Sequence, residues 1–233
     1  MAGNDIYTKL LLHSNGTDGS PLFPDASRSR HVVTAVGNAQ VDTSQYKFPT
    51  GSGLFDGAGD YLSVPDSPDW DFGSNALCYD FWVRLNDRTG LQCPLNFYMD
   101  DDNLFRINLM GDNTIKFYIV VATATALELT STTEILDATW YHLAVIRGWG
   151  SGANNWALCI DGTAEDTATY AGALSSNSKI LYIGSETPGN TAYNGWLDEI
   201  RISNGIARWT SNFTSPTEPY FNSGGLAFQP IIF

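Results

Sequence analysis

Short segments in which hydrophobic and polar residues alternate recur along the whole chain, separated by Gly, Asn, Asp and Pro. A period of two places successive side chains on opposite faces of a β-strand. Residues 77–85 are the clearest case, because every second residue from Tyr79 to Leu85 is apolar while Asp80 and Arg84 lie between them. No segment keeps a helical period over three turns. The pattern therefore predicts a chain built almost entirely of strands.

Turn residues join these segments into hairpins. Residues 103–110 and 114–122 flank Gly-Asp-Asn, and residues 139–148 and 156–163 flank a longer glycine-rich loop. About ten to fourteen short strands at this spacing predict an all-β fold, an antiparallel β-sandwich or jelly roll. No interior linker or change of composition divides the segments.

The ends of the chain differ from its middle. We expect residues 1–8 to form an N-terminal arm and residues 9–220 to form one jelly-roll domain, in which the turn-rich segment 203–220 is an irregular closing strap. Residues 221–233 are a glycine hinge followed by an apolar end. Because exposed apolar tails are a liability, we expect this tail to dock on its own domain or on a neighbouring subunit, which would make the protein a homo-oligomer.

One strand, residues 195–203, carries acids on both of its faces. Strict alternation puts Asp198 on one side with Trp196 and two isoleucines, and puts Glu199 and Arg201 on the other. We expect Glu199 and Arg201 to form a solvated pair. Asp198 falls on the apolar side, where a lone carboxylate is costly, so it needs a cation or several hydrogen-bond donors.

Charge and cysteine content limit the partners. The 233 residues carry 12 Lys and Arg against 25 Asp and Glu, a formal charge of −13. This balance argues against nucleic-acid binding and against an anionic membrane surface, and no stretch is long enough to insert into a membrane. It fits cation binding or simple solubility. The three cysteines are too few and too scattered for a disulfide framework, so Cys78 and Cys159 are expected to be buried free thiols.

Several segments, in this order, carry a family resemblance: FDGAGDYLSVPDS, YDFWVRL, TWYHLAVIRG, CIDGT, YIGS and GWLDEIRISNGIARWTSNFTSPTEPY. Over roughly residues 9–220 the chain resembles the laminin-G-like branch of the concanavalin A-like lectin/glucanase superfamily. The resemblance implies a jelly roll of two curved antiparallel sheets. The chain also resembles the versions of this domain that are found in phage and bacterial surface proteins. Since the N-terminus lacks a signal-peptide pattern, we expect synthesis in the bacterial cytoplasm and a final place on a virion or other extracellular particle.

The same resemblance implies a structural calcium ion at the edge of the sandwich. The matching positions are Asp198 and Asp25, and Asn15 would add an amide oxygen. Calcium binds carboxylate, amide and carbonyl oxygens of this kind. The alternative is a partner without metal, either an ion pair between Asp198 and Arg28 or Arg30 or hydrogen bonds from the backbone.

No catalytic pair is visible in the sequence. A glucanase of this superfamily needs carboxylates on one strand face, whereas Asp198 and Glu199 alternate, so we expect a protein that is not an enzyme. Two loops offer aromatic and amide groups for a surface glycan: Trp149 with Asn154 and Asn155, and Tyr193 with Asn190 and Asn194.

The expected function is therefore a binding or adhesion module for surface glycans. Rim packing of the loop aromatics is the simpler explanation for those residues. The alternative function, motivated by the apolar tail, is a structural virion component such as a capsid decoration, head-fibre or tail protein. Such a protein would act through contacts with other virion proteins.

Overall fold

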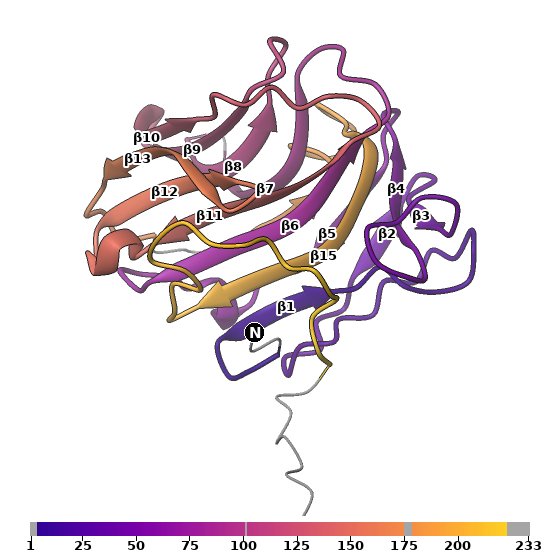
Figure 1. Cartoon of the computed structure of the whole chain (residues 1–233), viewed down its shortest axis with the longest axis horizontal. Helices are drawn as coiled ribbons and strands as arrows, with labels where there is room; N and C mark the ends of the chain where they lie inside the picture. Colours follow the sequence, from indigo (N-terminus) through magenta and orange to yellow (C-terminus); the bar gives the residue numbers. More distant parts are fainter. Residues whose placement is uncertain (1–3, 101, 175–178, 223–233) are drawn as a thin grey trace, which may run out of the picture.

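The computed structural model describes residues 4–100, 102–174 and 179–222, which form a sandwich of two antiparallel sheets (Figure 1). Eight strands make the first sheet, sheet A, in the order β13-β12-β11-β6-β15-β4-β3 with β1 added beside β15. Seven strands make sheet B, in the order β10-β9-β8-β7-β14-β5-β2. This architecture confirms the predicted all-β jelly-roll class.

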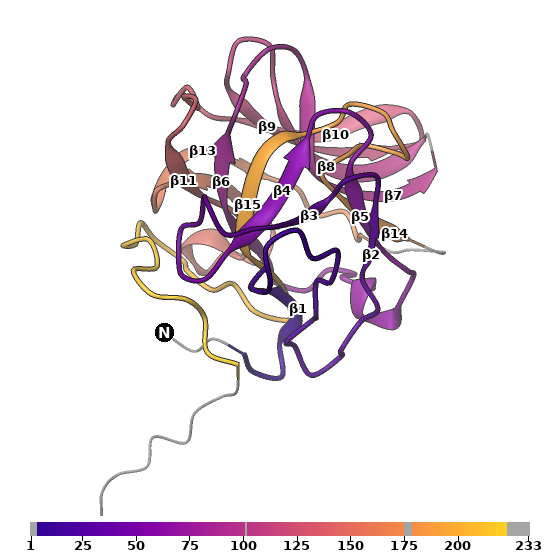
Figure 2. The same cartoon turned by 90° about the vertical axis from the view of Figure 1, so that its right-hand side faces the viewer.

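The strand boundaries follow the alternating segments closely. Sheet A contains β1 (Thr8–Leu12), β3 (Gln40–Asp42), β4 (Ser52–Asp56), β6 (Leu77–Leu85), β11 (Trp140–Arg147), β12 (Asn155–Ile160), β13 (Thr163–Thr169) and β15 (Asn194–Asn204). Sheet B contains β2 (Thr34–Val36), β5 (Tyr61–Val64), β7 (Gln92–Asp100), β8 (Asn103–Leu109), β9 (Ile115–Val121), β10 (Ala124–Thr130) and β14 (Ile180–Ile183). Two short 3-10 turns, Pro68–Trp70 and Trp149–Ser151, lie in loops. The short strands β2 and β3 lie at one end of the sandwich (Figure 2).

The core lies between the inner faces of the two sheets. Tyr79 of β6 packs among Phe97 of β7 and Phe105 of β8, with ring centroids 5.4 and 5.9 Å away. The predicted face of residues 77–85 is confirmed, because the alternate residues from Tyr79 to Leu85 all belong to this core. Two sheets stacked over such a layer are the usual β-sandwich arrangement.

The outer face of sheet A is buried as well, because the segment 205–220 crosses it as a strap (Figure 1). The Trp209 and Phe213 rings of this segment stack 3.9 Å apart. They pack against a small apolar cluster on the outer face, whose buried members are Cys78, Ala144, Ile146, Ala157 and Cys159. The strap predicted from the turn-rich sequence is confirmed, and the cysteines are buried free thiols as expected.

The first described residues belong to the body of the sandwich. Asn4 is buried, and Asp5 forms an ion pair of 2.7 Å with Arg208 in the strap. Residues 4–8 of the predicted arm therefore pack against the domain. Residues 223–233 lie outside the described residues, so the docking of the apolar tail and oligomerisation through it stay predictions. Among the residues in view, no helix is long and apolar enough to cross a membrane.

A β-bulge in β15 overturns the predicted faces of that strand. Asp198 lies opposite Trp82 of β6, but the next paired residue is Arg201, opposite Asp80. Glu199 adopts a positive φ of 50° within this irregularity. A bulge inserts one extra residue and so reverses the alternation beyond it. The prediction that Glu199 and Arg201 form a solvated pair is also wrong, because each is only 1% exposed.

Candidate functional site

A buried charged network lies between sheet A and the strap. Arg201 donates to Asp80 from Nε at 3.0 Å and from Nη2 at 3.2 Å. Tyr220, at the end of the strap, donates its hydroxyl to Asp80 and stacks under the guanidinium of Arg201. Burial alone would raise the pKa of Asp80, but the charge of Arg201 holds that pKa far below its usual value. The network fastens the strap and is structural.

Asp198 of β15 is also buried, and backbone N–H groups donate to it. Its Oδ2 accepts from the N–H groups of Lys47 at 2.9 Å and Phe48 at 3.0 Å. Burial raises the pKa of Asp198 to about 7. Arg28 and Arg30 are exposed and form no ion pair with it. Of the two metal-free partners predicted for Asp198, the arginine is therefore wrong and the backbone hydrogen bonds are confirmed.

The other two predicted calcium ligands bind separate backbone segments. Asp25 accepts four hydrogen bonds from its own loop and from β1. Asn15 accepts two, from the N–H groups of Thr50 and Gly51. Over the ranges that the structure describes, no group of three or more His, Cys, Asp or Glu side chains is arranged to hold a metal ion. A calcium site formed by Asp198, Asp25 and Asn15 stays a prediction.

The first predicted glycan loop is packed onto the body of the protein. Trp149 is half-buried against the apolar cluster under the strap. Asn154 accepts from Arg147 at 3.3 Å. Asn155 accepts from the Thr169 hydroxyl, also at 3.3 Å. All three side chains therefore have structural contacts, and glycan binding by this loop stays a prediction.

The second predicted glycan loop needs a correction. Tyr193 has no exposed surface, because its ring packs in the core beside Phe55 and its hydroxyl donates to the Arg84 carbonyl at 2.9 Å. A ring without an exposed face cannot stack on a sugar. Asn194 is half-buried at the rim, opposite Asp56 of β4.

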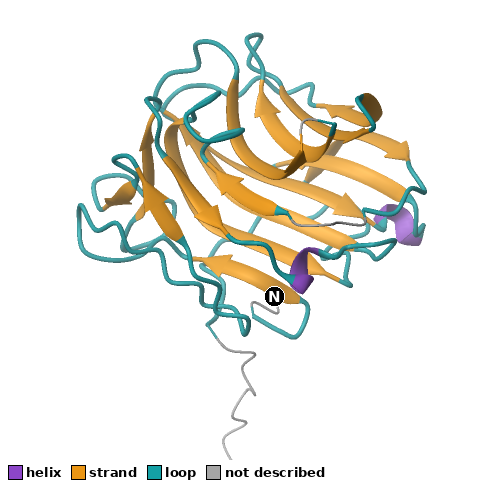
Figure 3. Cartoon of the chain, turned by 180° about the vertical axis from the view of Figure 1, so that it is seen from behind, coloured by secondary structure: helices purple, strands orange, loops and turns teal. Residues whose placement is uncertain are grey.

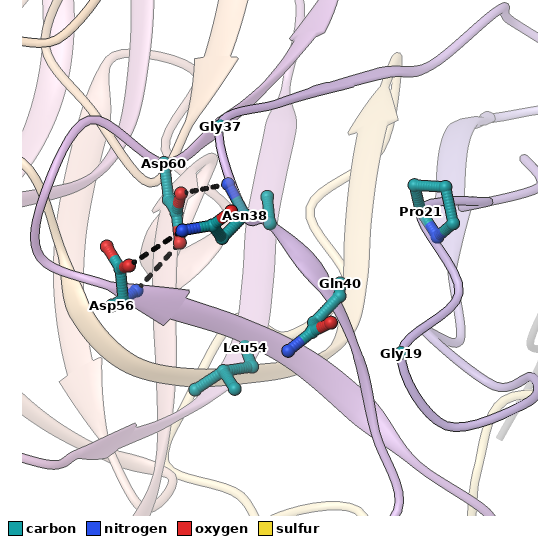
Figure 4. Close-up of a pocket in the computed structure, with 9 residues that line it drawn as sticks. Gly19, Pro21, Gly37, Asn38, Gln40, Leu54, Asp56 and Asp60 are labelled. Atoms are coloured by element: carbon teal, nitrogen blue, oxygen red, sulfur yellow. Dashed lines mark hydrogen bonds between the residues drawn. The ribbon is translucent and has the colours of Figure 1, made fainter.

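A polar hollow of about 430 Å³ lies close to Asp56 at this rim (Figure 4). Asp60 anchors one wall by accepting from the backbone N–H groups of Asn38 and Asp56. Gln40 and Leu54 continue the lining. The hollow offers amide and carboxylate groups but no aromatic ring, so it lacks a flat ring face on which a sugar can stack.

A second hollow, of about 360 Å³, lies on the outer face of sheet B and does have aromatic walls. Tyr61 of β5, which is half-buried, and Tyr182 of β14, which is 7% exposed, line it, with ring centroids 5.7 Å apart and nearly perpendicular planes. Tyr98 of β7 lies on the far side of Tyr182, at 6.3 Å. Figure 3 shows the molecule from the side of this sheet. We call these three rings and the hollow beside them the tyrosine surface.

Polar groups complete the lining of this hollow. Ser63 and Asp66 lie on its wall, together with the apolar residues Pro65, Ile180 and Pro188. Burial beside Tyr61 raises the pKa of Tyr182, so its hydroxyl stays protonated and can donate. Apolar walls with a few directed polar groups are typical of ligand sites.

A row of polar side chains extends from Tyr182 across the same face. Strand pairing places Tyr182 opposite Asn96, Asn96 opposite Arg106, and Arg106 opposite Tyr118. Glu186 covers part of this row, because it pairs with Arg106 and its carbonyl accepts from Asn96. Asn96 Oδ1 and Arg106 Nε are buried and have no hydrogen-bond partner among the described residues.

The alternation in the sequence predicts that each of the three rings points outward, but it cannot show that the rings lie together. Each tyrosine stands next to core residues in its strand: Tyr61 before Leu62, Tyr98 after Phe97, and Tyr182 after Leu181. Period two therefore predicts an outward ring in each strand. The strands are far apart in the chain, so only the pairing of β5, β14 and β7 reveals that the rings meet.

Solved structures show the same fold at low sequence identity. Domain 4 of AbnA, an extracellular arabinanase of Geobacillus stearothermophilus solved with arabinotriose, matches with a TM-score of 0.66 and 14% identity over 86% of this chain and 93% of that one. The binding domain of Paraclostridial Mosquitocidal Protein 1 matches with a TM-score of 0.65 and 16% identity over 86% of this chain. The binding domain of botulinum neurotoxin DC, solved with rat synaptotagmin II, also gives 0.65, with 13% identity over 86%.

The chain spans 49% of the length of each of the two toxin domains. A search of the curated proteins found no match. A family model described as the concanavalin A-like lectin/glucanases superfamily matches residues 56–209, which is more than half of the chain and includes the strands that carry the tyrosine surface. Together with the two-sheet sandwich, this match shows that the chain belongs to the laminin-G-like family of the concanavalin A-like superfamily.

Proposed function

We propose that this protein is a non-enzymatic carbohydrate-binding domain that takes a surface glycan on the tyrosine surface. The observation that carries the proposal is the hollow between Tyr61 and Tyr182, with Tyr98 beside it. Aromatic rings provide flat apolar area together with a polar tip, which matches the apolar faces and hydroxyls of a sugar. Ser63 and Asp66 supply hydrogen-bonding groups at the wall.

The outer face of sheet B from Tyr182 to Tyr118 is long enough for an oligosaccharide, with Asn96 buried beneath it. Neighbouring strands are about 4.8 Å apart, so three strand spacings cover about 14 Å. Arg106 is paired with Glu186, and Lys116 beside it is paired with Glu128. Since these cations already have acidic partners, the face favours an uncharged glycan over an acidic one.

The acids of β15 support a binding role over hydrolysis. Asp198 is engaged by backbone N–H groups, and Glu199 accepts from the Tyr220 N–H and contacts His13 at 2.6 Å. Both are buried, so neither is presented to a substrate. The AbnA domain solved with arabinotriose is a binding precedent on the same fold. We place the protein on a virion or another extracellular particle, where surface glycans are its targets.

We expect Tyr61→Ala to weaken glycan binding about tenfold, because tyrosine is enriched among the few contact residues whose truncation costs over 1 kcal/mol. The measurement is a glycan array with host-derived neutral and acidic glycans, followed by calorimetry on the best neutral hit. Tyr182→Ala is expected to have a similar effect, because it removes the ring against which Tyr61 packs.

The matched control is Tyr7→Ala, which removes an exposed tyrosine elsewhere and should leave binding unchanged. Trp149→Ala tests the loop predicted from the sequence. Loss of binding in Trp149→Ala but not in Tyr182→Ala would move the site to that loop, and no binding by the unmodified protein to any glycan would refute the proposal.

A further inference from the structure

A large open cleft lies on the opposite side of the sandwich, at the edge of the strap. It has a volume of about 740 Å³ and lies between the loop at Lys47, the outer face of β6 at Trp82, and strap residues 213–217. Asp161, in the turn between β12 and β13, closes one side. The residues of the tyrosine surface take no part in it.

Three hydrogen-bond donors in this cleft lack acceptors. Trp82 is 4% exposed, and its indole Nε1–H has no partner among the described residues. The Ser215 hydroxyl is likewise buried and unpartnered within those ranges. The ammonium of Lys47 lies 3.7 Å above the centre of the Trp82 ring, with no ion pair or hydrogen bond to any residue in view. A buried donor without an acceptor is unfavourable by about 1–3 kcal/mol in proteins.

The nearby acids Asp161 and Asp198 act on Lys47 through their charges, but neither forms a hydrogen bond with these three donors among the described residues. Asp198 uses its Oδ2 on the backbone N–H groups of Lys47 and Phe48. Asp161 uses its Oδ1 on the backbone N–H of His142, at 2.8 Å. The cleft is therefore lined by the Lys47 ammonium, by the nearby Asp161 carboxylate, and by the buried, unpartnered indole N–H of Trp82 and hydroxyl of Ser215.

We propose that this cleft binds a sugar that carries a carboxylate, such as a uronic acid residue. The sugar carboxylate accepts from Lys47 and from the Trp82 indole, and its ring hydroxyls reach Ser215 and Asp161. Phe48 and Phe213 supply apolar walls. Hydrogen bonds to a charged acceptor are about twice as strong as neutral ones, so the carboxylate is the group that anchors the ligand.

The flexibility of Lys47 and the screening of the net charge both allow an acidic ligand to bind. The side chain of Lys47 is long and flexible, so it can rotate from the indole ring toward an entering carboxylate. The overall charge of −13 opposes acidic ligands at long range, but charges farther than about 8 Å are screened at physiological ionic strength. Contacts inside the cleft therefore decide binding.

The test is a titration of the isotope-labelled full chain with D-glucuronate, followed through the indole N–H resonances. Trp82→Phe assigns the Trp82 signal by its disappearance. We expect that signal to shift with glucuronate but not with D-glucose, and Lys47→Met to weaken the effect about tenfold or more. Lys9→Met, at a half-buried lysine outside the cleft that pairs with Asp69, should change nothing.

Ser215→Ala provides a second, milder variant that keeps both the charge and the ring, and it should also weaken the shift. Tyr182→Ala should respond like the unmodified protein, which separates this site from the tyrosine surface. No shift of the Trp82 signal would overturn the proposal. An equal shift with acetate would overturn the sugar assignment, because a carboxylate alone would then suffice.

Discussion

Replacing Arg201 by methionine is expected to lower the free energy of unfolding by about 3–5 kcal/mol at pH 7, the usual result of removing one partner of a buried ion pair. Arg201 and Asp80 are 1% and 0% exposed. Methionine fills much of the space of the arginine stem, but it leaves the Asp80 carboxylate without its cation. Urea unfolding monitored by tryptophan fluorescence measures the change.

The pH dependence identifies the cause of this loss. In the native protein the pKa of Asp80 is depressed, so its contribution to stability is present above the ordinary carboxylate pKa of 3.8 and declines only as the pH falls through the depressed value. Without Arg201, burial raises that pKa, and the carboxyl is neutral in mildly acidic solution. The deficit of Arg201→Met should therefore shrink from pH 7 toward pH 4.

The matched control is Lys116→Met, which breaks the exposed pair between Lys116 and Glu128. Exposed pairs contribute about 0–1 kcal/mol, so this variant should unfold nearly like the unmodified protein. Equal losses of unfolding free energy in both variants would show that the buried Asp80–Arg201 pair stabilises the protein no more than an exposed pair does.

Asp198→Asn is expected to stabilise the protein above neutral pH, by at most about 4 kcal/mol for a shift of three pKa units. The pKa of Asp198 is raised to about 7, from an ordinary value of 3.8. Between these two values the folded state holds more protons than the unfolded state, so ionisation of Asp198 progressively destabilises the fold as the pH rises. Asparagine keeps an acceptor for the N–H groups of Lys47 and Phe48 without the charge.

The measurement compares urea midpoints at pH 4, where the two proteins should differ little, and at pH 8, in chelator and again with added calcium. Calcium binding at Asp198 would reverse the result, because the metal would stabilise only the unmodified protein. Asp42→Asn is the control of opposite sign. Hydrogen bonds from Ser44 and Trp196 outweigh burial and lower the pKa of Asp42. Asp42→Asn should therefore not stabilise the protein at pH 8.

Much of the fold could be read from local sequence. The alternation in residues 77–85 and the turn at Gly-Asp-Asn correspond to β6 and to the β8–β9 hairpin. These features depend on neighbours two to ten residues apart, so periodicity and turn chemistry are sufficient to predict them. The turn-rich strap was recognisable for the same reason.

Site residues were harder to predict because exposure depends on what covers a residue. Tyr193 stands in a loop rich in Gly and Asn, which made a solvent-facing ring a reasonable expectation, yet it lies in the core. Trp149 packs beneath the strap for a similar reason. Neither outcome follows from the residues adjacent in sequence.

Local patterning and composition were enough to predict the strand content, the class of fold, the inward face of residues 77–85 and three cysteines without a disulfide framework. The partner of Asp198, the reversal of faces after Glu199, and the meeting of Tyr61, Tyr98 and Tyr182 on one surface became visible in the folded chain alone. A bulge depends on pairing with the neighbouring strands, and a shared surface is formed by strands distant in the chain, so neither can be predicted from adjacent residues.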